Sequence, residues 1–435
     1  MAEYVERVWH PEDAGGLSRK DRAPGRYLAY VPDELGDRLP ALGFVAQGEA
    51  EDALAALARA DERIGTRGCY LNHLLIRSES ISSSWIEGNR VTPKRLAIAE
   101  LLHHGPRQAL DVVANVRATE AAIAELADRD RPITVEDIVD LQHIIEPRLE
   151  RGLREEQNWV GGPGWSPLRA AFVPPPELEV LRLVADLARF VTDTSGNPVV
   201  RAAIVHAQFE TIHPFIDGNG RTGRALIHTV LRRADALRNT LIPISTVFAG
   251  DTDSYIAGLT GYRVDPPSLN EWVIGFALAA ERAAGNAVRL SEDIAALDIQ
   301  VREDLVGFRR ERGLSPAIPR RDAVILRILD TLASDPVLTA ESVSTRLSVS
   351  PAAAHRALTE LAEASILGRA KEGGRLICWT ADRYLALVTL TERSNWVGGG
   401  DTRDRTPRLG PARPDVLKLG SGRSPNTTRT DSPRL

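Results

Sequence analysis

The sequence predicts a mainly α-helical protein with a smaller unit of helices and a β-hairpin near its C-terminal end. Long stretches are rich in Ala, Leu, Glu and Arg, which are good helix formers, and they place apolar residues at helical spacing. From Pro319 onward, short helical patterns are followed by a hairpin signal. The length of 435 residues predicts two to four domains, at about 100–200 residues each.

The N-terminal part is expected to be helical after an irregular start. Residues 1 to about 50 show little periodicity and carry turn signals. Helical patterning begins near Glu51, and further helices are expected over Cys69–Trp85, Pro93–His104 and much of 105–149.

Residues 151–177 interrupt this pattern. Gly and Pro cluster after Asn158, and Val173–Pro176 stops any helix, so turns and a short hairpin are expected. A later helix starts at Asn197–Pro198, and helical patterning then continues, after one more loop, as far as Arg312.

The C-terminal unit has its own pattern. Helices are expected over Ile325–Leu332, over Thr339–Leu347 and from Ser350, where Ser is a good N-cap and Pro351 suits the first helical position. A hairpin is expected over Ile366–Trp379. Three short helices and a hairpin are typical of a winged helix. The residues after about 395 have too few apolar side chains to fold, which predicts a disordered tail.

Composition excludes several classes of protein. The net charge of −5 gives no general attraction to nucleic acid. Cys69 and Cys378 are the two cysteines, which excludes a disulfide framework and predicts two buried, reduced thiols. No run approaches the ~20 apolar residues of a membrane span, and the charged start lacks the apolar run of a signal peptide. A cytoplasmic protein without membrane contact is expected.

The run His213–Arg224, HPFIDGNGRTGR, combines the parts of a polyphosphate site. Gly218, Asn219 and Gly220 let the backbone approach a ligand, and their N–H groups lie at the start of a helix, where anions bind. Two arginines follow: Arg221 and Arg224 are three residues apart and expected on the same side of the first turn, and guanidinium groups suit phosphate oxygens.

Two more residues of this run suit chemistry on a bound nucleotide. Asp217 offers the oxygen ligand that Mg²⁺ prefers, and His213 can take a proton near neutral pH as a general base. Phe215 is expected to point inward. Taken singly, the histidine is more often a cap and the Gly-Asn-Gly turn only a turn. The complete ordered string favours a functional site.

This string resembles the signature of the Fic family, HPFx(D/E)GNGRxxR. The resemblance extends over roughly residues 30–290 and implies an all-helical Fic core with a short β-hairpin flap, which Gln157–Gly162 and Val173–Glu177 resemble. Most members with the full signature transfer AMP from ATP to a Tyr, Thr or Ser hydroxyl of a protein. The flap pairs with an extended segment of the target.

The resemblance implies a role for each residue of the signature. His213 deprotonates the target hydroxyl, and Asp217 holds Mg²⁺ against the phosphates. The α-phosphate is bound by Gly218, Asn219 and Gly220. The outer phosphates are bound by Arg221 and Arg224, and Tyr255 resembles a position near the adenine.

Ser83–Gly88 resembles the inhibitory motif of the family, (S/T)xxxE(G/N). Ser83 and Glu87 are one helical turn apart, and Glu87 is expected to form a bidentate pair with Arg224 and so to hinder ATP. The alternative is an ordinary helix-end glutamate with Gly88 as its C-cap. Some members use this glutamate to remove AMP, and the sequence leaves that reverse activity open.

The expected division of the chain is an N-terminal helical region over 1–115, a Fic core over 116–288, a helical linker over 289–318, a winged helix over 319–392 and a disordered tail over 393–435. The rival function is a DNA-binding regulator whose core only senses nucleotide, with the third short helix in the major groove. A transferase placed on DNA or on a partner by its winged helix, and a homodimer, also stay open.

Overall fold

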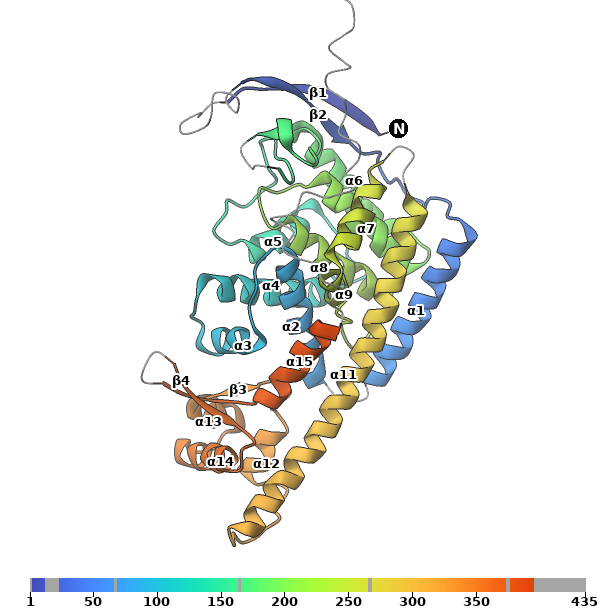
Figure 1. The fold of residues 1–435 in the computed structure, drawn as a ribbon. Coiled ribbons are helices and arrows are strands. Elements are labelled where there is room, and N and C mark those ends of the chain that lie inside the picture. Colours follow the sequence, from blue (N-terminus) through green and yellow to red (C-terminus); the bar gives the residue numbers. More distant parts are fainter. Residues whose placement is uncertain are drawn as a thin grey trace, which may run out of the picture.

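The computed structural model describes residues 2–11, 23–65, 69–162, 166–264, 268–372 and 376–394. Within these ranges the chain is mostly helical, as the sequence predicts (Figure 1). The first ten helices are α1 (Phe44–Gly65), α2 (Cys69–Ile86), α3 (Pro93–Leu102), α4 (Arg107–Ala124), α5 (Val135–Ile145), α6 (Glu177–Asp193), α7 (Pro198–Ile212), α8 (Asn219–Arg233), α9 (Ser245–Gly250) and α10 (Thr252–Tyr262).

The remaining elements are α11 (Leu269–Glu311), α12 (Val324–Leu329), α13 (Ala340–Leu347), α14 (Pro351–Glu363), α15 (Asp382–Ser394), the 3₁₀ turn η1 (Pro167–Arg169) and the strands β1 (Glu3–Trp9), β2 (Gly25–Val31), β3 (Val337–Leu338), β4 (Gly368–Glu372) and β5 (Leu376–Thr380). None of the described helices is both long and apolar enough to cross a membrane. The expected tail after residue 394 lies outside the described residues.

Helices α7 and α8 form the centre of the molecule. From Val199 to Ile212 every residue of α7 is buried, and α8 is buried almost throughout. Large side chains such as Phe209 and Ile212 join one continuous apolar core. Each such side chain stabilises the fold by about 1.5–3 kcal/mol through burial. The loop between these two helices is therefore mounted on the most rigidly packed part of the protein.

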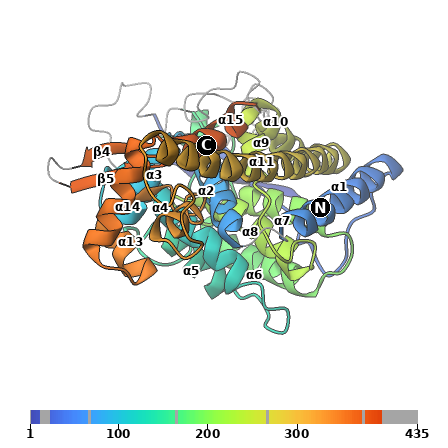
Figure 2. The ribbon, with the colours of Figure 1, turned by 90° about the horizontal axis from the view of Figure 1, so that it is seen from below.

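The longest helix, α11, runs beside α1 and continues to the C-terminal unit (Figures 1 and 2). No proline occurs between Leu269 and Glu311, so nothing stops the helix in between. The expected boundary between core and linker, at 288/289, falls inside α11, and the boundary at 115/116 falls inside α4.

The irregular start expected from the sequence is wrong. Strand β1 pairs antiparallel with β2 in a register that runs from Glu3 opposite Val31 to Trp9 opposite Gly25. Tyr27, Ala29 and Val31 are buried on one face of β2, and Tyr30 on the other face is buried as well. Helix α1 likewise begins at Phe44, before the expected start near Glu51.

The C-terminal unit has the expected order of helices, α12, α13 and α14, followed by the β4–β5 hairpin. Ser350 caps α14 with Pro351 in its first turn, as predicted, and Thr339 caps α13. Strand β3 adds a third strand to give the order β3-β5-β4, and Cys378 on β5 is buried. The side chain of Cys69 lies outside the described residues. The assignment of this unit as a winged helix stays a prediction.

Candidate active site

The loop of residues 213–218 joins α7 to α8, so the prediction that the signature is a loop that opens a helix is confirmed. His213 ends α7 in the left-handed region, with φ 48°, which histidine adopts more readily than most residues. Gly218, at φ 85°, precedes the first residue of α8 and suits this conformation because it lacks a Cβ. The N–H groups of the first turn of α8 lack intrahelical partners and can face an anion.

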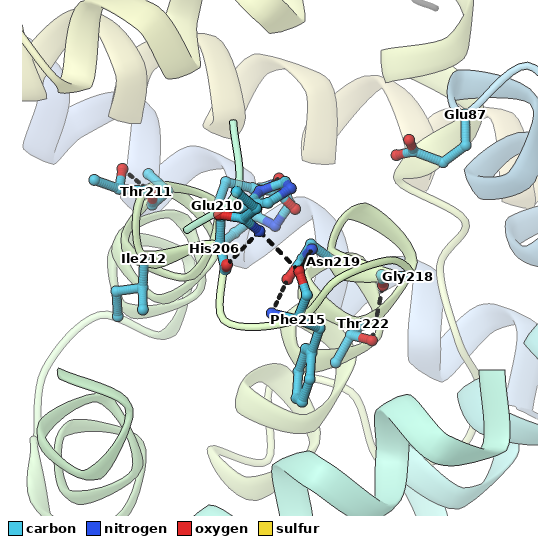
Figure 3. Close-up of polar contacts among 12 residues, drawn as sticks. Glu87, His206, Glu210, Thr211, Ile212, Phe215, Gly218, Asn219 and Thr222 are labelled. Atoms are coloured by element: carbon cyan, nitrogen blue, oxygen red, sulfur yellow. Dashed lines mark hydrogen bonds and ion pairs between the residues drawn. The ribbon is translucent and has the colours of Figure 1, made fainter. Parts of the chain in front are cut away.

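Asn219 holds the loop in shape (Figure 3). Its Oδ1 accepts a hydrogen bond from the Phe215 backbone nitrogen at 2.9 Å, and its Nδ2 donates to the Phe215 carbonyl at 2.8 Å. The Phe215 ring is buried, as predicted. Because both polar atoms of the Asn219 side chain are engaged in the loop, the group left for a phosphate is its backbone N–H.

Two residues that the sequence reasoning missed support the same loop from the flap side. The buried Arg154 donates from Nε to the His213 carbonyl at 2.9 Å and from Nη2 to the Pro175 carbonyl at 2.6 Å. Asn158 donates to the Phe215 carbonyl at 2.9 Å. In a chain this rich in arginine, no sequence signal separates Arg154 from the others. Burial lowers the pKa of Arg154 to about 10, so it remains charged at neutral pH.

The expected hairpin next to the loop is present but short. Val160 and Phe172 form an antiparallel bridge, with Val160 N donating to Phe172 O at 2.8 Å. Gln157 donates from Nε2 to the Pro174 carbonyl at 3.0 Å, which ties the two arms together. Contact of this hairpin with a target protein stays a prediction.

The His213 imidazole lies on the rim of the site with its side chain 19 % exposed. Burial, together with the guanidinium groups of Arg263 and Arg154, lowers the pKa of His213 to about 3. The ring is therefore neutral near pH 7, which is the form that accepts a proton.

The structure brings Ser83, Glu87 and Arg224 together across 137 or more residues of sequence. The Arg224 side chain is 1 % exposed. Its Nε donates to the Ser83 hydroxyl at 2.9 Å and its Nη2 to the Ser83 carbonyl at 2.8 Å. Nη2 also contacts Glu87 Oε1 at 2.7 Å. Among the described contacts the pair uses one carboxylate oxygen, not the expected two, because Ser83 and Tyr255 take the other donors of Arg224.

The Glu87 carboxylate lies directly against the first turn of α8. A methyl group on Gly220 would come within 1.9 Å of Glu87 Oε1. Burial would raise the pKa of Glu87, but the guanidinium groups of Arg224 and Arg221 outweigh burial and keep the pKa below its usual value. A charged carboxylate thus lies between a helix N-terminus and a guanidinium, which is how a phosphate group is held.

Arg221 has a different partner from Arg224. Its Nη2 pairs with Glu146 Oε1 at 2.6 Å and lies 3.6 Å from Asp217 Oδ1. Glu146 was not expected from the sequence, since it ends α5 far from the signature. Within the described part of the chain the buried Arg221 Nε has no hydrogen-bond partner. A direct role of Arg221 on phosphate stays a prediction.

Asp217 projects outward, with its side chain 60 % exposed, and its Oδ1 accepts a hydrogen bond from Gly218 N at 2.6 Å. No group of three or more His, Cys, Asp or Glu among the described residues is arranged to hold a metal ion. A single exposed carboxylate nevertheless suits Mg²⁺, which often takes one or two carboxylates and completes its ligands with phosphate oxygens and water.

Tyr255 lies behind Arg224, inside the core. Its hydroxyl is 2.8 Å from His206 Nε2 and accepts a hydrogen bond from Arg224 Nη1 at 3.3 Å. Its ring stacks on Phe248 at 4.7 Å between centroids. In the described structure Tyr255 therefore supports the arginine, and its expected place near an adenine stays a prediction.

A helix N-terminus with a buried arginine, preceded by a neutral histidine, defines a site for chemistry beside a bound polyphosphate. Comparison with protein families is consistent with this class, since residues 132–231 match the Fic/DOC family. The chain therefore contains a Fic domain, which includes α7, the loop and α8 as far as Leu231.

Similar proteins carry related names. The chain is 29 % identical over 210 residues to a protein adenylyltransferase Fic from Drosophila grimshawi. The matched segment covers 44 % of this chain and 39 % of that relative. It is 36 % identical over 109 residues to the protein of the same name from Drosophila ananassae. This match covers 23 % of this chain and 20 % of that relative. The chain thus spans less than half the length of these relatives.

Among solved structures, a Fic family protein from Desulfovibrio desulfuricans G20 aligns with a TM-score of 0.47 and 20 % identity, over 79 % of this chain and 97 % of that one. A Fic-1 fragment from C. elegans aligns with a TM-score of 0.43 and 20 % identity, over 57 % and 74 %.

Proposed function

We propose that this protein transfers AMP from ATP to a Tyr, Thr or Ser hydroxyl of a target protein, and that Glu87 restrains the transfer. One observation carries the proposal: the Glu87 carboxylate lies on Arg224 and against Gly220, where a helix N-terminus and a guanidinium would otherwise hold phosphate. The Fic domain and the names of the relatives support transferase activity at the level of the family.

In this proposal His213 accepts the proton of the target hydroxyl. The hydroxyl oxygen then attacks the α-phosphorus, the bond from that phosphorus to the bridging oxygen breaks, and pyrophosphate leaves. The N–H groups at the start of α8 stabilise the charge that develops on the α-phosphate. Bound polyphosphate adds negative charge near His213, which favours the protonated ring and makes the histidine a stronger base than in the free enzyme.

Asp217 and the phosphates would together hold a Mg²⁺ ion, which when bound supplies positive charge to the leaving pyrophosphate. The exposed position of Asp217 supports this assignment, because its carboxylate can contact an ion that keeps several waters. Arg221, fixed by Glu146, adds a positive charge on the same side of the loop.

The target segment would lie along the flap at Gln157–Gly162. The Val160–Phe172 bridge leaves the flap with a short arm to which a further strand can be added through backbone hydrogen bonds. Arg154 and Asn158 connect this arm to the carbonyls of His213 and Phe215. The flap and the base are thus held in one network, which supports a target hydroxyl positioned beside His213.

Glu87→Gly tests the proposal, because it removes the carboxylate from Arg224. With ATP labelled at the α-phosphate and Mg²⁺, we expect label on the protein itself or on proteins of a lysate. Adding His213→Ala to the same variant should lower the rate by about 10²–10⁴-fold, since it removes the base. Glu179→Gly, on the exposed side of α6, is the matched control. Absence of label from the Glu87→Gly variant would count decisively against transferase activity.

A second function rests on the C-terminal unit. His355 and Arg356 are exposed on α14, the helix that would enter a major groove if this unit were a DNA-binding winged helix. Binding to duplex DNA that weakens steeply with salt, without AMP transfer in the Glu87→Gly variant, would favour the nucleotide-sensing regulator instead. Release of AMP from a modified target would favour the reverse activity.

A further inference from the structure

Glu210 is a buried acid that the proposed reaction has not used. It lies on the last turn of α7, three residues before His213, and its Oε2 is 4.0 Å from His213 Nδ1. Its other oxygen, Oε1, is buried and has no hydrogen-bond partner among the described residues. The Glu210 backbone also lies beside the His213 ring and favours its protonated form. Both the backbone and the side chain of Glu210 therefore face the base.

The surroundings of Glu210 leave room for its carboxylate but give it no close partner. A methyl group on Gly223 would lie 2.8 Å from Glu210 Oε1, so the glycine in α8 makes the space that this oxygen occupies. Arg263 donates from Nη2 to the Glu210 backbone carbonyl at 3.1 Å and from Nε to the Thr211 hydroxyl at 3.2 Å. A buried carboxylate oxygen without a partner destabilises a protein, so its presence requires a reason.

We propose that Glu210 is a positioning residue for His213. Its carboxylate and its backbone carbonyl both lie on the Nδ1 side of the ring, which favours the tautomer whose Nε2 is free to take the target proton, and the carboxylate charge stabilises the imidazolium that results. The proton moves from the target oxygen to Nε2, Nδ1 keeps its own proton, and no bond to Glu210 changes. At 4.0 Å the carboxylate acts on the ring through its charge, without a direct hydrogen bond. This inference rests on the proposed function of His213.

The groups that face Glu210 predict how it responds to pH. They come from several elements and are His206, His213, Arg224, Arg263, Tyr255 and Glu87. Burial raises the pKa of Glu210 to about 7, with Glu87 adding to the rise against the opposing guanidinium of Arg224. The carboxylate form then appears as pH rises toward neutrality, and removing Glu87 favours that form further.

The test compares Glu210→Gln and Glu210→Asp in the Glu87→Gly background. We expect Glu210→Gln to lower kcat by about tenfold or more while KM for ATP changes little, because only the transition state needs the imidazolium. The acidic limb of the pH–rate profile should also move to lower pH, since Glu210 no longer titrates. Glu210→Asp retains a carboxylate. It should therefore keep part of kcat and keep the acidic limb of the pH–rate profile near its original pH. A purely structural role would change stability and KM but leave the limb in place, which would overturn the inference.

A second readout needs no activity. Nitrogen-15 NMR of labelled histidine, with His213→Ala to assign the signal, reports which ring nitrogen carries the proton. Since the backbone carbonyl of residue 210 stays in place, we expect the share of Nδ1–H on His213 to be larger when Glu210 is present than in Glu210→Ala. An unchanged His213 signal overturns the role of Glu210 even if AMP transfer is observed. Conversely, failure of Glu87→Gly to label any protein rejects the transferase proposal and leaves the NMR result valid for the Glu210–His213 pair.

Discussion

Helices α2 and α7 both lie inside the protein and both approach the site, but the contacts that hold them differ. Helix α7 is fixed mainly by apolar side chains, including Val205, Phe209 and Ile212. In α2, residues 77–84 are all buried, yet only Ile81 among them is apolar. The helix with the base is thus held mainly by the core. In α2 the core holds the first half, through Leu71, Leu74 and Leu75, whereas the half that leads to Glu87 is held mainly by polar contacts.

The polar contacts of α2 are specific but incomplete. Glu79 accepts a hydrogen bond from Ser245 N at 2.9 Å, and Asn115 donates to the Ser84 hydroxyl at 3.2 Å. The hydroxyls of Ser78 and Ser82 are buried without a partner among the described residues. A typical hydrogen bond stabilises a fold by only about 0.5–1.5 kcal/mol, because water replaces it on release.

The middle of α2 is also tied to the C-terminal unit. Arg77 pairs with Glu100 at 2.6 Å and donates from Nη1 to the Ser334 carbonyl at 2.6 Å. The difference between the two helices indicates that the C-terminal half of α2 can loosen at a lower free-energy cost than α7, which suits a reversible restraint beside a permanent catalytic loop.

The largest effect on stability is expected from removing an apolar side chain that holds α7 in the core. Phe209→Ala removes a fully buried ring from α7 and should lower the free energy of unfolding by about 3–5 kcal/mol. Urea denaturation measures the change. Leu178→Ala, at an exposed position of α6, is the control and should change stability by less than about 0.5 kcal/mol. A loss at Phe209 no larger than at Leu178 would show that α7 is not the rigid support described here.

A smaller effect on stability is expected from removing one of the polar contacts that hold the C-terminal half of α2. Ser83→Ala removes the hydroxyl that accepts from Arg224 Nε and should lower the free energy of unfolding by about 1.5–3 kcal/mol, the range for hydrogen bonds to charged groups. It should also raise AMP transfer, because Arg224 is then less firmly held. Ser82→Ala is the matched control, since its buried hydroxyl has no partner in the described structure and its loss should leave stability unchanged or slightly higher. If Ser83→Ala and Ser82→Ala changed stability and AMP transfer equally, the Ser83–Arg224 hydrogen bond would not be what holds Arg224.

The smallest effect is on the pH dependence of stability. It depends on His206, a buried residue of α7. Burial, with Arg224 nearby, lowers the pKa of His206 to about 3. In the unfolded chain the histidine pKa is near 6.5. Between pH 6.5 and about pH 3 the unfolded chain therefore binds one more proton at His206 than the folded protein does. The free energy of unfolding falls as pH falls through this range, by about 1.4 kcal/mol per pH unit for one such histidine. Urea unfolding at pH 6.0 and 5.0 measures the slope. His206→Gln should reduce the slope, and an unchanged slope would show that His206 is not buried in the neutral form.

The sequence predicted the central part of the site well because its signals are local. The order of His213, Gly218 and Arg224 along one loop and one helix start depends on neighbouring residues, and the structure places them as expected. The link from Glu87 to Arg224 spans 137 residues and was reached only through the resemblance to a family, not through any physical signal in the chain.

Residues that act through tertiary packing could not be predicted. Arg154 and Glu146 come from separate elements, and only the folded chain places them against the loop. Glu210 is close to His213 in sequence, but its burial beside the base depends on the packing of α8. The β1–β2 hairpin was missed for a related reason, since half-buried alternation over seven residues is weak beside the turn signals around it.

The central claim is that the Glu87 carboxylate occupies the place of a phosphate group on Arg224. It is tested most directly by the rate of AMP incorporation from labelled ATP for the unchanged protein and for Glu87→Gly, side by side at the same ATP concentration. Loss of a charged hydrogen bond of about 1.5–3 kcal/mol predicts that Glu87→Gly is faster by roughly 10- to 100-fold. Two proteins that incorporate AMP at equal rates would contradict the claim.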